Sequence, residues 1–358
     1  MQSLRKMGQV FPLGLSFDDV LLIPQHSGIK SRSLVDLTTQ LTPSVSLKLP
    51  ILSTNMTDVT GVEMAIALGK LGGMGILPRF ENPKVQADMV KQVKKNEVSV
   101  AAAVGCKEGF LDRAEKLAKA GVDILLLDIA HGHMQQALDA TKKIKNKFGQ
   151  KIGLISGAIA TYAGANDLYQ AGADCVRVGV GPGSICTTRI VTGVGIPQIT
   201  AITEASKAAK KWKRTILADG GIKNSGDIAK ALAAGASAVS LGNVFAGTDE
   251  APGKIVIRKG KKYKIYRGST SIESKNDHQK KLSDLSNNYL HHIEGVEGLV
   301  PFKGPVQNLV LQFVANLKSS FSYVGAKNLR QFHRYAKFIR VTSLGLRENG
   351  PHDILTQD

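Results

Sequence analysis

The sequence predicts an α/β fold, a closed (β/α)8 TIM barrel, and three observations support this. The chain has 358 residues, a length that a barrel of about 250 residues accommodates as one domain with insertions. Short apolar runs alternate with amphipathic stretches from Pro50 onward. The phrase Ala-Gly-x-Asp or Ala-Gly-x-Ser recurs at Ala120–Asp123, Ala171–Asp174 and Ala234–Ser237, as expected for a repeated helix-to-strand junction whose glycine is a left-handed cap.

Eight apolar runs have the length and residue types of buried strands. They are Pro50–Thr54, Gly73–Leu77, Ser99–Val104, Asp123–Asp128, Ile152–Ser156, Asp174–Val180, Thr215–Ala218 and Ala238–Leu241. Helical patterns separate them, for example Phe110–Ala120, Gln135–Phe148, Ala163–Ala171 and Ala201–Lys211. Strands that alternate with helices in this way predict a parallel sheet, and eight of them suffice to close it.

The remaining segments frame this barrel. Residues 1–49 form an N-terminal segment, and residues 50–252 and 305–358 form the barrel and its C-terminal helices. Residues 253–304 follow the eighth strand as a polar insertion with little periodicity between Ser269 and His292. Insertions of this length are usually functional, so we expect a mobile flap. Helical patterning returns over Leu309–Leu317 and Leu329–Phe338, and the whole chain is predicted to be a single catalytic domain.

The strongly basic composition favours small anionic ligands. The net charge is +18, with clusters at Lys210–Arg214, Arg258–Lys264 and Lys280–Lys281. A solvated basic surface draws anionic small molecules toward the protein. Nucleic-acid binding would need the charge along one face, with interleaved aromatic residues or a recognisable module, and neither is visible. We therefore expect a small-molecule partner and no nucleic acid.

The cysteine pattern indicates a reducing compartment, and the hydropathy indicates a protein without a membrane span. The chain has 3 cysteines, an odd number at wide spacings without a Cys-x-x-Cys motif. This pattern argues against a disulfide framework and against a structural zinc site. No window approaches the apolar length of a membrane span, and no signal-peptide core follows the N-terminus. We expect a cytoplasmic protein that does not associate with membranes.

The segment after the sixth predicted strand carries the chemistry. Active sites of such barrels lie at the C-terminal ends of the strands, where Gly179–Arg189 is placed. Its glycines allow the backbone to approach a ligand closely. Cys186 follows them, with hydroxyl residues and Arg189 nearby to favour the nucleophilic thiolate. We therefore predict Cys186 as a nucleophile, whereas Cys175, within a strand, is expected in the core.

Seven motifs occur along the chain in the order of one known family. They are Phe17–Pro24, Asp128–His133, Gly179–Arg189 with Gly195–Gln198, Ala218–Ile222, Gly242–Thr248, Glu294–Gly298 and Val300–Gly304. On these motifs the chain resembles the IMP dehydrogenase/GMP reductase family, purine nucleotide oxidoreductases that are usually homotetramers. The regulatory domain that dehydrogenases commonly insert after the second strand is absent, because Arg79 leads through one helix into the third strand.

The resemblance assigns further site residues. The nucleotide phosphate would lie against Ser184, Gly221, Gly242 and Asn243, and the ribose hydroxyls would bond to Asp219. The stretch that closes over the nucleotide would contribute Tyr266, Gly268 and Ser271. The nicotinamide cofactor would lie near Asp128, Ile129, Ala130 and Gly179. The carbonyls of Gly181, Gly183 and Cys186 match a potassium site that many IMP dehydrogenases use.

Two reactions occur in this family, and both pass through a covalent bond between the cysteine and purine C2. Dehydrogenases pass hydride from IMP to NAD and then hydrolyse the intermediate with the help of an Arg-Tyr pair on the flap. Here no arginine occurs between Arg267 and Arg330, and the flap tyrosine, Tyr289, follows Asn288. The resemblance therefore implies a GMP reductase, which expels ammonia from GMP and adds hydride from NADPH to give IMP.

In this interpretation Thr188 and Glu294 relay a proton to the departing amine, a general-acid role that needs a carboxyl group within hydrogen-bond reach. Glu297 is the second candidate carboxylate. The reductase interpretation is also favoured by Ile129 and by three short motifs. These are Asn55–Met56, Thr192–Gly195 and Tyr323–Ala326.

Two alternatives stay open. IMP dehydrogenase with NAD is favoured by His131–His133 and by Glu294–Gly298, which resemble that branch. A catalytically degenerate nucleotide-binding paralogue is suggested by the high charge and by Ala158, where the family normally has Asn. Arg79 likewise stands where Lys is usual. The two histidines are too few for a metal site and are expected to be loop residues or neighbours of the cofactor.

Overall fold

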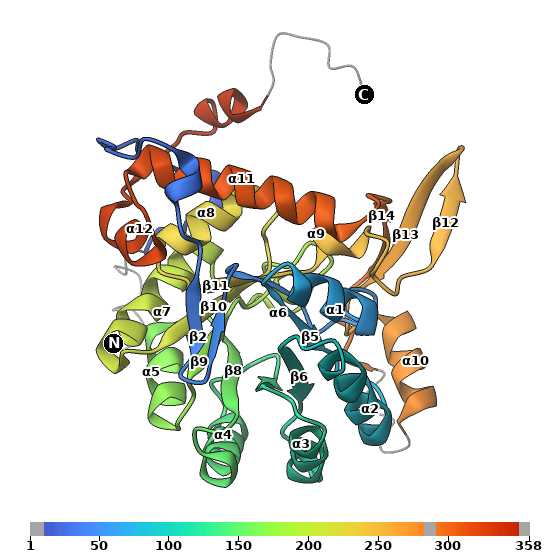
Figure 1. Ribbon diagram of the computed structural model, residues 1–358. Coiled ribbons are helices and arrows are strands. Elements are labelled where there is room, and N and C mark those ends of the chain that lie inside the picture. Colours follow the sequence, from blue (N-terminus) through green and yellow to red (C-terminus); the bar gives the residue numbers. More distant parts are fainter. Residues whose placement is uncertain (1–10, 283–290, 351–358) are drawn as a thin grey trace, which may run out of the picture.

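The computed structural model describes residues 11–282 and 291–350, and it contains the predicted closed barrel (Figure 1). All eight barrel strands are parallel, and the last strand pairs with the first. In barrel order they are β4 (Ile51–Ser53), β5 (Met74–Leu77), β6 (Val100–Val104), β7 (Ile124–Asp128), β8 (Gly153–Ile159), β9 (Cys175–Val178), β10 (Thr215–Asp219) and β11 (Ala238–Leu241). Each strand overlaps its predicted run, so the predicted fold class is confirmed.

Helices surround the barrel (Figure 1). They are α1 (Val62–Lys70), α2 (Pro83–Lys94), α3 (Phe110–Lys119), α4 (Gln135–Phe148), α5 (Tyr162–Gln170), α7 (Gln198–Trp212) and α8 (Ser225–Ala233). Two short helices, α6 (Thr188–Thr192) and α9 (Asn243–Ala246), lie in the loops after β9 and β11. The chain passes from β5 through α2 directly into β6, so no separate domain interrupts the barrel there.

The repeated helix-to-strand junction has the predicted conformation. Gly121, Gly172 and Gly235 have φ of +94°, +106° and +117°, the left-handed region that glycine adopts without strain. The residue two positions later links the start of its strand to the neighbouring strand. The Asp123 and Asp174 carboxylates accept hydrogen bonds from the backbone N–H groups of Val100 (2.8 Å) and Leu154 (3.0 Å). In the third copy the Ser237 hydroxyl accepts from Ile216 N–H at 3.4 Å.

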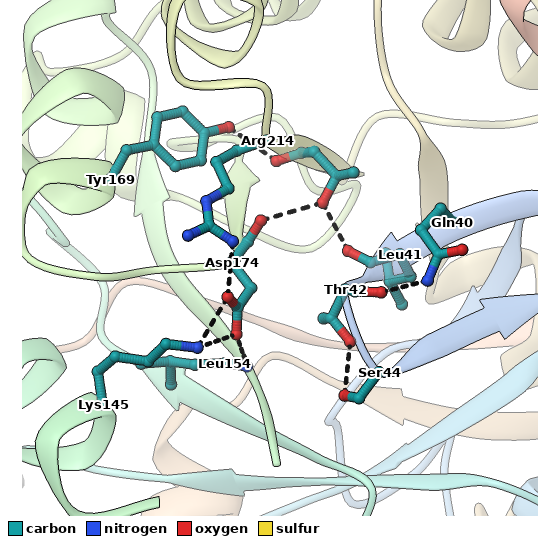
Figure 2. A network of polar contacts seen from close by, with 10 residues as sticks. Gln40, Leu41, Thr42, Ser44, Lys145, Leu154, Tyr169, Asp174 and Arg214 are labelled. Carbon is teal, nitrogen blue, oxygen red and sulfur yellow. Dashed lines mark hydrogen bonds and ion pairs between the residues drawn. The ribbon is translucent and has the colours of Figure 1, made fainter. Parts of the chain in front are cut away.

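Asp174 is the centre of a polar network at the base of the barrel (Figure 2). Its side chain is 1% exposed and accepts hydrogen bonds from the Lys145 ammonium (2.8 Å) and the Arg214 guanidinium (3.0 Å). The Thr215 hydroxyl donates to the Leu41 carbonyl at 2.5 Å and lies 3.2 Å from the Asp174 carbonyl. A buried carboxylate is tolerated here because two cations and a backbone N–H compensate its charge.

A hairpin closes this end of the barrel. It consists of β2 (Thr39–Thr42) and β3 (Val45–Leu47), which pair antiparallel. Leu41, Val45 and Leu47 pack with apolar side chains from the barrel strands in one cluster. Because the N-terminal end of the barrel is filled in this way, a ligand site is left to the C-terminal end.

The flap has more regular structure than the sequence predicted. It contains β12 (Ile255–Arg258), β13 (Lys261–Arg267), α10 (Ile272–Lys281) and β14 (Glu297–Pro301), and the three strands form an antiparallel sheet. The sequence between Ser269 and His292 has little periodicity, and it did not reveal the helix α10. The reason is that α10 buries polar side chains, so it has no apolar stripe that a sequence pattern could reveal. Tyr289 lies outside the described residues.

The two end segments of the chain meet. The N-terminal β1 (Val20–Leu22) pairs antiparallel with β15 (Phe338–Arg340), which follows the helices α11 (Val306–Val324) and α12 (Leu329–Tyr335). The helix predicted over Leu329–Phe338 therefore ends early, and its last predicted residue belongs to a strand instead. Among the described residues, no helix is long and apolar enough to cross a membrane.

Candidate active site

A cavity of about 510 Å³ opens at the C-terminal ends of the barrel strands. Its lining comes from the ends of several strands and from the flap. Representative lining residues are Asn55, Asp128, Arg177, Gly179, Cys186, Asp219, Gly242, Tyr266 and Glu294. This is the end at which barrel enzymes place their chemistry, because loops there combine side chains from different strands.

The loop after β9 places Cys186 at this cavity beside a chain of two hydrogen bonds. The Cys186 Sγ atom lies 3.1 Å from Thr188 Oγ1, and the Thr188 hydroxyl donates to Glu294 Oε2 at 2.7 Å. Because the threonine proton points to the carboxylate, its oxygen is available to accept the thiol proton. Sulfur, hydroxyl and carboxylate are thus connected for proton transfer, although Glu294 is 106 residues from Thr188.

Backbone contacts hold the flap against the Cys186 loop. The Thr187 N–H donates to the Glu294 carbonyl at 3.0 Å, and the Val296 N–H donates to the Ile185 carbonyl at 3.1 Å. Cys186 and Gly295 also form an isolated antiparallel bridge. These contacts on both sides of Glu294 fix where its carboxylate lies relative to the thiol.

Most residues that the resemblance assigned to the nucleotide lie together. Ser184, Asp219, Gly221, Gly242, Asn243, Tyr266 and Gly268 all line the cavity. Gly242 is required for close approach, because a Cβ atom there would meet Tyr266 Oη at 2.8 Å. Gly221 has φ of +78°, which favours glycine. Burial raises the pKa of Tyr266, so its phenol is a neutral hydrogen-bonding group.

Ser271 and Ile129 are exceptions. Ser271 is fully buried and its hydroxyl accepts a hydrogen bond from Ser274 N–H at 3.2 Å, so it caps α10 and does not line the cavity. Ile129 packs with the apolar cluster between the barrel and the outer helices, and it is absent from the lining as well. Its neighbours Asp128 and Ala130 do line the cavity, as does Gly179.

A network of buried charges occupies the cavity wall. The Asp128 carboxylate accepts hydrogen bonds from Arg79 and from Arg177, each at 2.9 Å. Arg177 also donates to the Asn55 side chain at 2.9 Å, and its Nε lies 3.6 Å from Asp219 Oδ2. Burial alone raises the pKa of Asp128, but the charges of the two arginines outweigh it and lower that pKa. Asp128 is therefore anionic near neutral pH.

Asp219 responds differently to the same network. Burial raises the pKa of Asp219, and the positive charge of Arg177 only partly opposes this. Burial lowers the pKa of Arg177, but the two carboxylates outweigh it and raise that pKa. Arg177 was not among the residues that the sequence predicted for the site. Its one signal was a charged residue within the apolar run Cys175–Val178, because a charge inside a barrel strand is expected to have a specific partner.

Arg189 and Cys175 have structural roles. The Arg189 guanidinium donates to the carbonyls of Ile196 (2.6 Å) and Val180 (3.4 Å), so it holds the two ends of the loop and is not bonded to Cys186. Arg189 was expected to favour the thiolate of Cys186, but the structure shows no contact between the two side chains. Cys175 is buried among the side chains inside the barrel, and burial raises its pKa to about 12, as expected for an inert core cysteine.

One of the two histidines after β7, His133, has a carboxylate partner that the sequence did not reveal. His133 Nε2 lies 2.8 Å from Asp167 Oδ2 on α5. The described residues contain no group of three or more His, Cys, Asp or Glu side chains that could hold a metal ion. Glu297, the second candidate carboxylate, lies exposed on β14 and is absent from the cavity lining.

Comparison with known proteins places these features in a family. Residues 14–352 match the model described as the IMP dehydrogenase / GMP reductase domain. The chain is 38% identical to an inosine-5'-monophosphate dehydrogenase of Borreliella burgdorferi, covering 96% of this chain and 97% of the relative. It is 32% identical to a GMP reductase of Leishmania major, covering 96% and 97%.

A solved structure gives the same result. The fold superimposes with a TM-score of 0.92 on a GMP reductase variant of Trypanosoma brucei in complex with guanosine 5'-monophosphate, at 30% identity, covering 98% of this chain and 100% of that chain. The chain therefore belongs to the IMP dehydrogenase/GMP reductase family of oxidoreductases, which act on purine nucleotides with nicotinamide cofactors.

Proposed function

We propose that this protein is a GMP reductase, which converts GMP to IMP and ammonia with NADPH. The observation that carries the proposal is the Cys186–Thr188–Glu294 chain of contacts at 3.1 Å and 2.7 Å, together with a flap sequence that lacks the Arg-Tyr pair of the dehydrogenases. The sequence contains no arginine between Arg267 and Arg330, so the part of the flap that follows Arg267 offers no arginine to activate water. Lysine is a poor substitute, because its protonation equilibrium differs from that of arginine.

The geometry supports a balanced sequence of steps. The Cys186 thiol gives its proton through Thr188 to Glu294 while Sγ bonds to purine C2 of GMP and the π electrons of the C2=N3 bond move to N3. Glu294 returns that proton through Thr188 to the C2 amino group, which leaves as ammonia when the C2–N bond breaks and the C2=N3 bond forms again. When C2 has then received a hydride, the C2–S bond breaks with its electron pair on sulfur, IMP departs and the Cys186 thiolate recovers a proton from water.

The cavity wall beside Asp128 fits the nicotinamide end of the cofactor. Ala130 and Ala158 provide apolar surface, and the ionised Asp128 and Arg79 provide polar groups at its edge. NADPH bound there supplies the hydride. The polar side chain that the family usually has at position 158 is absent, so Arg79 and Asp128 would hold the carboxamide with less help from β8.

A potassium ion is a second proposed ligand. The carbonyls of Gly181, Gly183 and Cys186 are backbone oxygen donors, the kind that binds potassium. The Gly183 carbonyl accepts the Cys186 N–H at 3.1 Å and keeps a second lone pair. Bound there, the ion would stabilise the conformation of the Cys186 loop. Exchange of potassium for sodium is expected to lower kcat, and equal rates in both salts would contradict the site.

Nicotinamide absorbance and ammonia release test the reaction. The purified protein is incubated with GMP plus NADPH and, separately, with IMP plus NAD. We expect loss of NADPH with equimolar ammonia in the first mixture and no change in the second. NADH formation in the second mixture alone would instead establish IMP dehydrogenase, which the identity to the Borreliella relative favours. No change of nicotinamide absorbance in either mixture, with GMP binding retained, would establish a nucleotide-binding paralogue.

The quaternary structure is also a proposal. We infer a homotetramer, as the resemblance implies. Light scattering of the protein as it elutes from a size-exclusion column measures the mass of the assembly directly. A mass corresponding to one chain of 38.2 kDa would contradict the tetramer.

A further inference from the structure

The flap helix α10 buries a polar face. Its buried side chains are Ser274, Lys275 and His278, and the buried cap Ser271 extends the stripe. The spacing i, i+3, i+4 and i+7 is that of the face that a surface helix normally fills with apolar residues. Packing of apolar surface does not explain this stripe, so the polar groups need another explanation.

Lys275 is the most unusual member of the stripe. It is 2% exposed and belongs to the largest fully buried side chains of the protein. Lysine is almost never fully buried without compensating partners. Its Nζ donates a hydrogen bond to the carbonyl of His292, two residues before Glu294 in the chain. The segment that carries the Glu294 carboxylate is therefore tied to α10 through this ammonium group.

The electrostatics connect the same two residues. Burial lowers the pKa of Lys275, and the negative charge of Glu294 opposes that shift. Glu294 is one negative charge that acts on Lys275. His278, one turn along the helix, has a pKa lowered to about 3 by burial, so it is neutral near pH 7. The ammonium group of Lys275 is thus bonded to the backbone two residues before the carboxylate that ends the Cys186–Thr188–Glu294 chain.

We propose that Lys275 is a positioning residue for the proton relay: its ammonium anchors the Glu294 segment and offsets the negative charge of that carboxylate beside Cys186. Two negative groups joined by one hydroxyl repel each other, and a nearby cation reduces the repulsion. The proposal rests on the proposed function only for the role of Glu294 in proton transfer.

Three variants separate charge from packing. Lys275→Met keeps the apolar stem and removes the charge, and Lys275→Arg keeps the charge. Lys280→Met is the matched control on the same helix, because that side chain is 79% exposed. The first measurement is steady-state kinetics. We expect Lys275→Met to lower kcat about tenfold or more with little change in KM for GMP, since a misplaced relay affects chemistry more than binding.

The second measurement does not require turnover. Cys186 is alkylated with iodoacetamide over a range of pH, and mass spectrometry reads each cysteine separately. In Lys275→Met we expect the half-maximal pH for Cys186 alkylation to rise by about half a unit, equivalent to an about threefold slower rate below it. Cys106, half-buried and outside the cavity lining, serves as the internal control. Its alkylation should not change.

The outcomes distinguish the hypotheses. Recovery of both kcat and the alkylation profile in Lys275→Arg supports a role of the charge. An unchanged Cys186 profile in Lys275→Met overturns the proposal, as does an equal shift in the Met and Arg variants, which would indicate packing alone. If the parent protein does not turn over GMP with NADPH, the proposed function fails, but the alkylation profiles still decide the role of Lys275.

Discussion

At the scale of single residues, the proposed chemistry depends on one sulfur atom at the cavity and on the hydroxyl that it contacts. Cys186 is half-buried, and its Sγ lies 3.1 Å from Thr188 Oγ1. Cys186→Ala is expected to reduce turnover at least about 10³-fold, because the covalent route then has no nucleophile. The measurement is NADPH consumption with GMP. Cys106→Ala, the control, should retain the parent rate, and residual turnover near that rate in Cys186→Ala would refute covalent catalysis.

Two glutamates of the flap, Glu294 and Glu297, are candidates for the general acid. Glu294 accepts the Thr188 hydroxyl at 2.7 Å, whereas Glu297 is exposed on β14. Glu294→Gln is expected to lower kcat by about 10²- to 10⁴-fold, the usual contribution of a general acid, with KM for GMP nearly unchanged. Glu297→Gln should behave as the parent. A reversed order of the two variants in kcat would mean that Glu297 carries the proton.

At the scale of secondary structure, α10 connects the flap to the loop after β5. His278 stacks on Phe80 with ring centroids 3.7 Å apart, and the Arg79 guanidinium lies 4.4 Å from the centre of the Phe80 ring. Lys281 forms an ion pair with Glu81. Two consecutive residues of that loop, Phe80 and Glu81, therefore hold the helix.

This docking is expected to weaken in acid. Burial, together with the charges of Arg79 and Lys281, lowers the pKa of His278 to about 3, from 6.5 when the ring is exposed. Between these values the undocked helix binds the additional proton, so docking loses up to about 1.4 kcal/mol per pH unit as the pH falls below 6.5. The protection factors of the α10 amides, which are corrected for the pH dependence of intrinsic exchange, should fall from pH 7.5 to pH 5. His278→Phe, which can still stack, should show a smaller fall; an identical loss of protection in that variant would exclude His278 as the cause.

At the scale of the whole molecule, the two ends of the barrel differ in structure: one is closed by packing, and the other contains the cavity. The closed base contains the Asp174 network, in which Lys145 and Arg214 compensate a carboxylate that is 1% exposed (Figure 2). The open end contains the cavity and its buried charges. Stability and chemistry are therefore expected to be separable by mutation.

Asp174→Ala tests this separation. Removal of the carboxylate leaves two partly buried cations without their partner, and breaking such a cluster typically reduces the free energy of unfolding by about 3–5 kcal/mol. Urea unfolding measures the change. The variant should keep the kcat of the parent for as long as it is folded. A loss of kcat in folded protein would show that the base of the barrel communicates with the cavity.

The sequence by itself determined the barrel and indicated the candidate nucleophile, because both depend on local patterns. Periodicity in each run predicted all eight strands, and the glycines at positions 121, 172 and 235 marked the helix-to-strand junctions. The Gly-rich loop indicated Cys186 without reference to distant residues. The family motifs also placed Glu294 correctly near Thr188, although the separation of 106 residues gives no local signal.

The tertiary structure alone decided the contacts between distant segments. Asp128 meets Arg79 and Arg177, each 49 residues away, because the C-terminal ends of β5, β7 and β9 converge at one rim. Ser271 caps a helix instead of lining the cavity, and α10 buries Lys275, which no apolar pattern could indicate. Periodicity reports which face of an element is apolar. It does not report which charges from separate elements share a buried volume, since that depends on how the closed barrel brings them together.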